Sequence, residues 1–317
     1  MYPYNHKMGQ RIQTDAEGVA VDRAFLAHYH VDAADAPAAD ADGVAVIILG
    51  EEADEITTGI TNPAVPRNLT VVANVSGVTG TVTITGTDFA GNEIEEKFTL
   101  NGQTADTGKL AFKTITKIEV PVQSNTPAKQ TETIKITNGC TSTDGNITVR
   151  VTATTLLGSD SPRDVTVALT TTNHGTAAKV AAAIVAALNA DEKVGAVFNA
   201  TVTGEGNDTV QLETKEPVAN DSSLAFSITA GSTGVTAGSS TNGTTGVPYD
   251  KVLVGWGDKF GLPYKLYADE LVILKLVNKA KEGTEGTVTA DPDDLAKNTF
   301  DPNDTTLGVD IDLYIIV

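Results

Sequence analysis

Two histidines, His28 and His30, are separated by a single residue in a short apolar segment near the start of the chain. On a β-strand this spacing turns both imidazole rings to the same face, where their nitrogens can bind a transition metal. The other histidines, His6 and His174, and the single cysteine, Cys140, do not adjoin this pair in sequence. Two ligands make a weak metal site. We therefore favour packing or a subunit contact for His28 and His30 and predict no bound metal.

Three acidic segments have the oxygen-rich composition of calcium-binding loops: residues 40–43, 291–294 and 301–304. The first lacks the closing glutamate of such a loop, and Ala38 stands where a ligand would be needed. The other two begin with Asp-Pro, a pair that favours turns. We interpret all three segments as solvated turns.

Signatures of the common catalytic classes are absent from the sequence. Residues 102–110 have some glycines of a phosphate-binding loop, but their spacing is wrong and no serine or threonine follows Lys109. Neither the nucleophile elbow of serine hydrolases nor the His-Glu-x-x-His zinc motif occurs. Cys140, between Gly139 and Thr141, we interpret as an inert thiol. We therefore expect no enzyme activity and no cofactor.

The charge of the chain restricts its partners. Its 317 residues include 22 basic and 41 acidic ones, which give a net charge of −19. Such a surface repels nucleic acids and anionic membranes, because phosphate binding needs clustered Lys and Arg. The sequence also has no run of about 18 apolar residues that would span a membrane, and its first ten residues lack the apolar core of a secretory signal. We expect neither nucleic acid nor membrane as a partner.

The composition predicts a mainly β fold. The chain is 40% hydrophobic but only 5% aromatic, and it is rich in Thr, Val and Gly, which favours strands joined by many turns. One cysteine allows no intrachain disulfide, so stability must come from packing or from partners. The length suffices for two or three domains. We predict that residues 1–55 form an extended N-terminal arm, which lies on another subunit or on another part of the fold.

A split base domain is predicted from residues 56–127 and 248–317, as a β-sandwich or barrel of short strands. Alternation is clearest over residues 111–120, where Phe112, Ile115, Ile118 and Val120 are candidate core residues. Residues 270–277 are predicted to form a buried strand. The apolar strand at residues 310–317 must be paired into a sheet, because an unpaired one would be an edge prone to aggregation.

An inserted α+β domain is predicted between them, over residues 128–247, with the element order ββαβββ. Its helix covers residues 176–189, since Val180, Ile184 and Leu188 recur on one helical face and alanine fills most other positions. Thr176 is a plausible N-cap. The Gly/Ser/Thr-rich run from 231 to 246 is interpreted as a flexible exit.

The least repetitive segment is Gly-Trp-Gly-Asp-Lys-Phe-Gly-Leu-Pro-Tyr-Lys-Leu at residues 255–266, which holds the only tryptophan. We interpret it as a loop with two compatible roles. Its aromatic residues form a hydrophobic plug on the sheet, with glycine allowing tight turns, or they contact a neighbouring subunit. The candidate interface residues of the chain are therefore Trp256, Phe260, Tyr264, Phe25, His28, Tyr29 and His30.

The segment at residues 255–266, together with Ile-Thr-Thr-Gly-Ile-Thr-Asn-Pro-Ala-Val-Pro-Arg-Asn-Leu at residues 56–69, resembles a tailed-phage virion structural protein type encoded near the major capsid protein. The C-terminal Val-Asp-Ile-Asp-Leu-Tyr-Ile-Ile-Val at 309–317 fits the same pattern. Residues 128–247 resemble the small α+β modules of phage tail sheath and other virion proteins. The resemblance covers about half of the chain, implies a structural role and transfers no catalytic residue.

The resemblance, the acidic charge and the missing catalytic motifs together predict a capsid decoration (cement) protein on the outer surface of a phage head, made in the host cytoplasm. Its expected partners are the major capsid protein and copies of itself, as a homotrimer. One alternative is a tail or baseplate structural protein. Another is a carbohydrate-binding adhesive β module, which would need an exposed aromatic platform built from Trp256, Phe260 and Tyr264.

Overall fold

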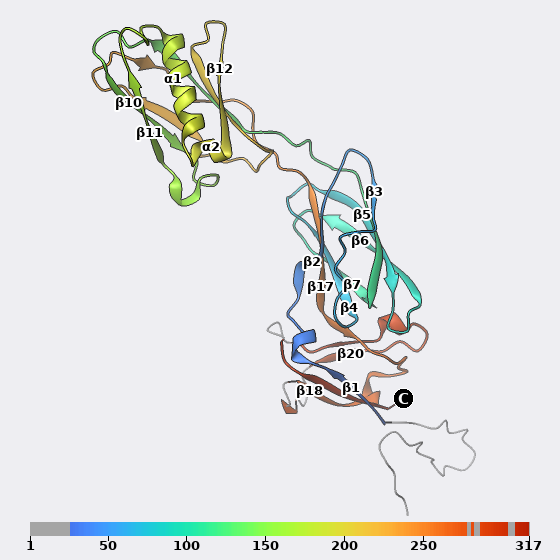
Figure 1. Ribbon diagram of the computed structural model, residues 1–317. Helices are drawn as coiled ribbons and strands as arrows, with labels where there is room; N and C mark the ends of the chain where they lie inside the picture. The colour runs from blue at the N-terminus through green and yellow to red at the C-terminus, as the bar shows by residue number, and fades with distance from the viewer. Residues whose placement is uncertain (1–25, 278–279, 282–285, 304–307, 317) are drawn as a thin grey trace, which may run out of the picture. The chain divides into compact units, whose positions relative to one another are not determined.

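A computed structural model describes residues 26–277, 280–281, 286–303 and 308–316 of the chain. The predicted fold class is confirmed, because the described residues are mainly antiparallel β-strands (Figure 1). The chain divides into two compact units. Unit 1 comprises Met1–Ser124 and Asp250–Val317, and unit 2 comprises Asn125–Tyr249. The boundaries predicted from the sequence were residues 128 and 247.

Unit 1 contains a sandwich of two sheets. The first sheet has the strand order β20-β21-β17-β4-β7, and β2 pairs with β17 as well. Its strands are β2 (Asp40–Ile48), β4 (Arg67–Ala73), β7 (Asp106–Phe112), β17 (Lys251–Gly261), β20 (Thr287–Thr289) and β21 (Thr299–Asp301). The second sheet has the order β3-β8-β5-β6. Its strands are β3 (Asp54–Ile56), β5 (Thr79–Thr87), β6 (Glu93–Asn101) and β8 (Thr114–Val120).

The sandwich core is built from alternate residues of the facing strands, as period-2 side-chain alternation requires. The four candidate core residues Phe112, Ile115, Ile118 and Val120 are all buried, which confirms that part of the prediction. The alternating segment over residues 111–120 is not a single strand. β7 ends at Phe112 and β8 begins at Thr114, so the chain passes from one sheet to the other at this point.

A third sheet of unit 1 has the order β1-β22-β18-β19. Its strands are β1 (Leu26–Val31), β18 (Val272–Val277), β19 (Ala280–Lys281) and β22 (Ile311–Ile316). β22 is paired on both sides, which confirms the prediction that the C-terminal strand is paired into a sheet. The strand predicted over residues 270–277 is present as β18, but its predicted burial is only partial, because Ile273 is 52% exposed. A continuous apolar run does not tell which of its alternating faces is covered.

The described residues of the predicted N-terminal arm lie on other parts of unit 1. β1 pairs with β22, β2 pairs with β17 and β3 pairs with β8. The arm was predicted to lie either on another subunit or on another part of the fold. These pairings put its residues 26–55 on unit 1 of the same chain. Phe25 lies outside the described residues.

Unit 2 packs two small sheets and a helix around its own core. Its elements are β9 (Thr131–Asn138), β10 (Gly145–Thr152), β11 (Arg163–Leu169), α1 (Ala177–Ala190), α2 (Val194–Val197), β12 (Phe198–Thr203), β13 (Thr209–Thr214), β14 (Ala225–Thr229), β15 (Thr236–Ala237) and β16 (Thr241–Asn242). The sheets have the orders β11-β10-β14 and β12-β13-β9-β15, with β16 also on β9. Figure 1 shows α1 lying along these strands.

Helix α1 has the burial pattern that its sequence predicts. Val180, Ile184 and Leu188 are fully buried in the core of unit 2. The hydroxyl of Thr176 accepts a hydrogen bond from the backbone N–H of Lys179, which makes it the N-cap. The order ββαβββ is wrong, because β9 precedes the predicted elements. Its first inward-facing residue is Glu132, whose carboxylate accepts a hydrogen bond from Ser240, so the apolar alternation that marks a strand is broken.

Unit 2 is expected to fold without unit 1. Its core is formed by its own residues, and its two ends are joined by a backbone bridge between Ala128 and Val247. We predict that a fragment of residues 125–249 unfolds cooperatively, as measured by denaturant titration followed with circular dichroism. A fragment that begins at residue 139 and so lacks β9 is the control and should not fold. A non-cooperative transition of the longer fragment would contradict the prediction.

Phe260 is expected to be important for the stability of unit 1, because its ring is fully buried. We predict that Phe260→Ala lowers the free energy of unfolding by about 3–5 kcal/mol. The control is Tyr267→Ala, because Tyr267 is 84% exposed and the loss of its ring should change stability by less than about 0.5 kcal/mol. Chemical denaturation of both variants measures the difference, and equal effects would show that the ring is not a core residue.

Candidate functional site

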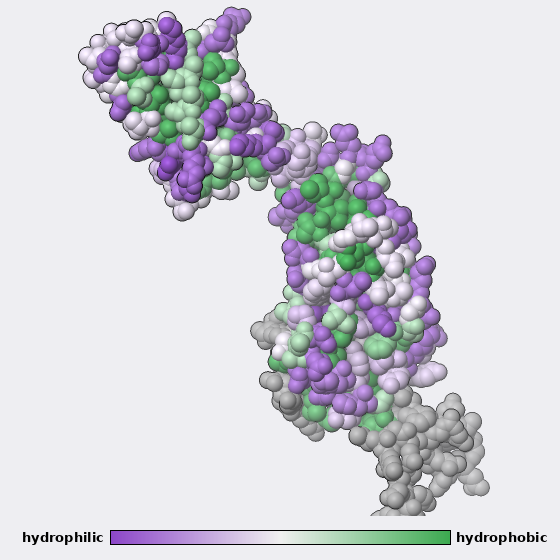
Figure 2. All heavy atoms as spheres, viewed as in Figure 1, coloured by the Kyte–Doolittle hydropathy of each residue, from purple (hydrophilic) through white to green (hydrophobic). Residues whose placement is uncertain are grey.

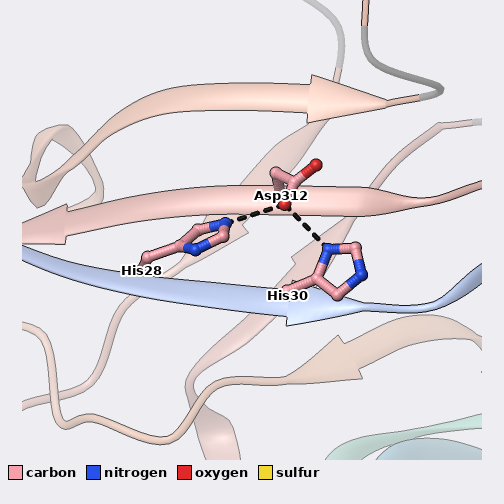
Figure 3. A group of neighbouring side chains, drawn as sticks. All are labelled: His28, His30 and Asp312. Carbon is pink, nitrogen blue, oxygen red and sulfur yellow. Dashed lines mark hydrogen bonds and ion pairs between the residues drawn. The ribbon is translucent and has the colours of Figure 1, made fainter.

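A cluster of His28, His30 and Asp312 joins the first and the last described strands of unit 1 (Figure 3). β1 and β22 run antiparallel, with His30 opposite Asp312 and His28 opposite Tyr314. Residues two apart on a strand share a face, so His28, His30, Asp312 and Tyr314 all project from the same side of this strand pair. The shared strand face that the sequence predicts for the two histidines is therefore present.

A single carboxylate oxygen lies between the two imidazoles. Asp312 Oδ1 is 2.7 Å from His28 Nε2 and 2.7 Å from His30 Nδ1. The other ring nitrogen of His30, Nε2, is 3.0 Å from Asp32 Oδ1. The His28 ring also stacks on Tyr314, with ring centroids 4.6 Å apart. These contacts fix both rings, while 41% of the His28 side chain and 39% of the His30 side chain stay open to solvent.

The hydrogen bonds of the cluster favour the ionised forms of Asp312 and His30. Partial burial of Asp312 by itself raises the pKa of its carboxyl, but hydrogen bonds from His28 and His30 outweigh this and hold the pKa below its usual value. Hydrogen bonds to Asp32 and Asp312 raise the pKa of His30. The cluster is therefore a place where positive charge is stabilised between carboxylates.

Sequence reasoning missed Asp312 because it lies 282 residues from His30 along the chain. The only local signal is the alternation of Asp310 and Asp312 with apolar residues in the C-terminal segment, which marks one polar strand face. The carboxylate of Asp310 also accepts a hydrogen bond of 3.1 Å from the backbone N–H of Ala33, two residues after the end of β1. Neither segment alone shows that the strand carrying Asp312 pairs with the strand carrying His28 and His30.

Tyr29 points to the opposite side of β1 from the two histidines. Its ring packs edge-on against Phe89, with centroids 6.0 Å apart. Burial raises the pKa of its hydroxyl group to about 12. Tyr29 is therefore mainly a packing residue of unit 1, and it does not join the histidine cluster.

The predicted aromatic loop is wrong in its local structure, because residues 255–261 belong to β17, a strand of 11 residues. Its strand neighbours approach so closely that a Cβ atom on Gly255 would lie 1.8 Å from the carbonyl oxygen of Asp40. Phe260 is fully buried and Tyr264 is half-buried, both in the core under the third sheet. This arrangement matches the plug interpretation for these two residues.

Trp256 is half-buried and covers β2. Its indole Nε1 donates a hydrogen bond of 3.4 Å to the carbonyl oxygen of Ala38. Its ring lies directly over Gly43, where an added Cβ would be 2.7 Å from ring atom Cη2. Glycine at position 43 therefore makes room for the only tryptophan.

Arg67 is a buried cation that sequence reasoning did not select. Its guanidinium donates a hydrogen bond of 2.7 Å from Nη1 to the carbonyl oxygen of Pro37 and lies 4.6 Å from the centroid of the Phe260 ring. Burial lowers the pKa of Arg67 to about 10, and the nearby Asp258 opposes this shift. Arg67 thus links β4, the segment before β2 and the buried end of β17. The one sequence signal was its position after two prolines in a turn-rich segment.

The acidic segments act as turns where the structure describes them. Asp291 Oδ1 accepts hydrogen bonds of 2.9 Å from the backbone N–H groups of Asp293 and Asp294. Among the described residues, the groups of three possible metal ligands are His28, His30 and Asp312, and His30, Asp32 and Asp310. The segments at 40–43, 291–294 and 301–303 contribute to neither group. Cys140 is buried.

An open groove of about 300 Å³ on unit 2 is lined by residues of β10 and β14 and by Ser239 and Ser240. Its one charged lining residue is Arg150. That guanidinium is held by two hydrogen bonds of 2.7 and 2.8 Å to Asp164. Its other polar side chains are the hydroxyl groups of Thr152, Ser227, Ser239 and Ser240, which lie beside Ala225 and Phe226.

Comparisons of this protein with known protein families, with curated proteins and with solved structures found no match. Neither helix of the described chain is long and apolar enough to cross a membrane.

The contact between Trp256 and Gly43 can be tested by a double-mutant cycle. We predict that Gly43→Ala destabilises unit 1 by about 1–3 kcal/mol, because the added methyl group collides with a rigid ring. Trp256→Ala should also lower stability, and the double variant should be more stable than the sum of both losses implies, by at least about 0.5 kcal/mol. Denaturant unfolding measures all three variants. Strict additivity would show that the two residues do not interact.

Proposed function

We propose that this protein is a decoration protein on the outer surface of a tailed-phage capsid, where it binds the shell and copies of itself. The observation that carries the proposal is an apolar row on the outward face of the first sheet of unit 1. Val46 on β2 and Val72 on β4 are both register partners of Leu253 on β17, so the three side chains lie side by side.

This row is accessible to a partner. Val46 is 52% exposed, and Ile48, which extends the row by two residues on the same face of β2, is 59% exposed. Leu253 and Val72 are half-buried. Figure 2 shows hydrophobic residues gathered on this face of unit 1. A contiguous exposed apolar patch on a soluble domain usually marks a protein–protein contact, because its desolvation favours association.

The charge of the chain fits a partner that is protein and a position outside the particle. With a net charge of −19, the chain is repelled by packaged DNA and discouraged from non-specific association. An apolar row within an acidic surface then restricts tight contacts to partners whose shape and polarity match that row. Decoration of this kind would stabilise the shell through binding energy that is available only in the assembled state.

The structure gives the carbohydrate-binding alternative less support than the sequence did. It required an exposed aromatic platform, whereas Phe260 is fully buried and Trp256 lies over Gly43. The tail alternative differs from the proposal in the location and the copy number of the chain, and it is decided by experiment.

The proposed surface predicts the effect of charge on particle binding. We expect Ile48→Asp to weaken binding to particles stripped of this protein by at least about tenfold, which corresponds to about 1.4 kcal/mol. Ile273→Asp is the matched control, because Ile273 is similarly exposed but lies on β18 of the third sheet. Co-sedimentation of each variant with the particles measures the affinity. Equal binding of wild type and Ile48→Asp would reject the row as the binding surface.

Location on the particle tests the proposal independently of that surface. Antibody labelling of intact virions should mark the heads, and the copy number per particle should be of the order of the capsid subunits. Label confined to tails, with a low copy number, would overturn the capsid proposal and favour the tail alternative.

A further inference from the structure

We propose that His28, His30 and Asp312 bind one divalent transition-metal ion of the zinc class, which joins β1 to β22. The ligand atoms are His28 Nε2, His30 Nδ1 and Asp312 Oδ1, which converge from two strands within 4.8 Å of one another. This inference does not depend on the proposed capsid function. It concerns a different sheet of unit 1 from the one that carries the apolar row.

The spacing of the three atoms is close to that of a metal site. Asp312 Oδ1 is 2.7 Å from each of the two imidazole nitrogens. Bonds of about 2.0 Å in a tetrahedral zinc site hold the ligand atoms about 3.3 Å apart. Each nitrogen and the oxygen therefore need to separate by about half an ångström, which small side-chain rotations at a solvent-exposed strand face can provide.

The second nitrogen of His30 already has the partner that metal-bound histidines usually have. Its Nε2 lies 3.0 Å from Asp32 Oδ1, and an N–H group donated to a carboxylate orients the ring and leaves the other nitrogen free to bind a metal. A neutral imidazole carries only one N–H group. A metal ion would replace the proton between His30 Nδ1 and Asp312 Oδ1. With the remaining proton on Nε2, the Nδ1 lone pair and the carboxylate oxygen can both bind the ion.

The donor set selects the class of metal. Two imidazole nitrogens and one carboxylate oxygen suit Zn²⁺, Co²⁺, Ni²⁺ or Cu²⁺, whereas Mg²⁺ and Ca²⁺ prefer sites made of oxygen alone. His28 and His30 are exposed, so water molecules can complete the coordination. The neighbouring group of His30, Asp32 and Asp310 has only one nitrogen, which makes it the weaker candidate for these metals.

The ion would tie the first described strand of unit 1 to the last. His28 and Asp312 are 284 residues apart along the chain. β1 is held in its sheet by β22, and three metal bonds would add a cross-link between these two strands. Binding only to the folded chain would also stabilise unit 1 in proportion to the logarithm of the metal concentration.

Calorimetric titration of ZnCl₂ into the full chain, made without a histidine tag and freed of metal with a chelator, tests the proposal. We expect one equivalent of Zn²⁺ to bind to the wild type. His28→Gln and Asp312→Asn should each weaken binding by well over tenfold, and Asp32→Asn, which removes only the orienting carboxylate, by about tenfold. MgCl₂ and CaCl₂ should produce no comparable heat.

The matched control is His174→Gln, since His174 lies in unit 2 and its Nδ1 accepts a hydrogen bond from the backbone N–H of Thr170. This variant should bind Zn²⁺ as the wild type does. Should a cluster variant fail to fold, the visible spectrum of Co²⁺ added to the wild type decides, because nitrogen ligation shifts and intensifies its bands. Absence of Zn²⁺ binding, undiminished binding in Asp312→Asn, or a Co²⁺ spectrum identical to that of the aqueous ion would each overturn the proposal.

Discussion

The structure of unit 1 depends on one strand, β17, whose backbone and side chains serve several neighbours at once. It pairs with β2, β4 and β21. Val252 and Val254 at its beginning are buried in the sandwich core, and Phe260 near its end is buried in the core under the third sheet. Its pairing register shifts between Trp256 and Phe260. A strand that belongs to two cores makes their formation interdependent, because displacing it exposes apolar surface in both.

Close approach of strands around β17 explains the unusual composition of its segment. Glycine at 255 lets the backbone of β2 approach, and glycine at 43 accommodates the ring of Trp256. At the other end of β17, the guanidinium of Arg67 lies against Phe260 and donates a hydrogen bond to Pro37. A buried guanidinium needs such partners to offset the loss of hydration. The segment preceding β2 is thus bound to the core through a cation, and β2 itself through strand pairing.

The surfaces that remain for partners lie away from these packed interfaces. The apolar row around Leu253 uses the outward face of strands whose inward residues form the sandwich core. The histidine cluster uses the solvent-exposed face of β1 and β22, and their inward residues Val31, Ile311 and Leu313 are buried. Period-2 alternation lets one strand stabilise the fold with one face and present chemistry with the other. A change at either surface is therefore expected to affect binding more than folding.

The sequence by itself determined the mainly β class, helix α1 with its Thr176 cap, and the core positions Phe112, Ile115, Ile118 and Val120, because these follow from local periodicity and capping. It also placed His28 and His30 on one strand face. Only the tertiary structure showed that residues 255–261 form a central strand, that Arg67 is buried and that Asp312 lies between the two histidines. The physical reason is that strand pairing joins segments hundreds of residues apart through backbone hydrogen bonds common to all residues, so local sequence does not specify which segments become neighbours.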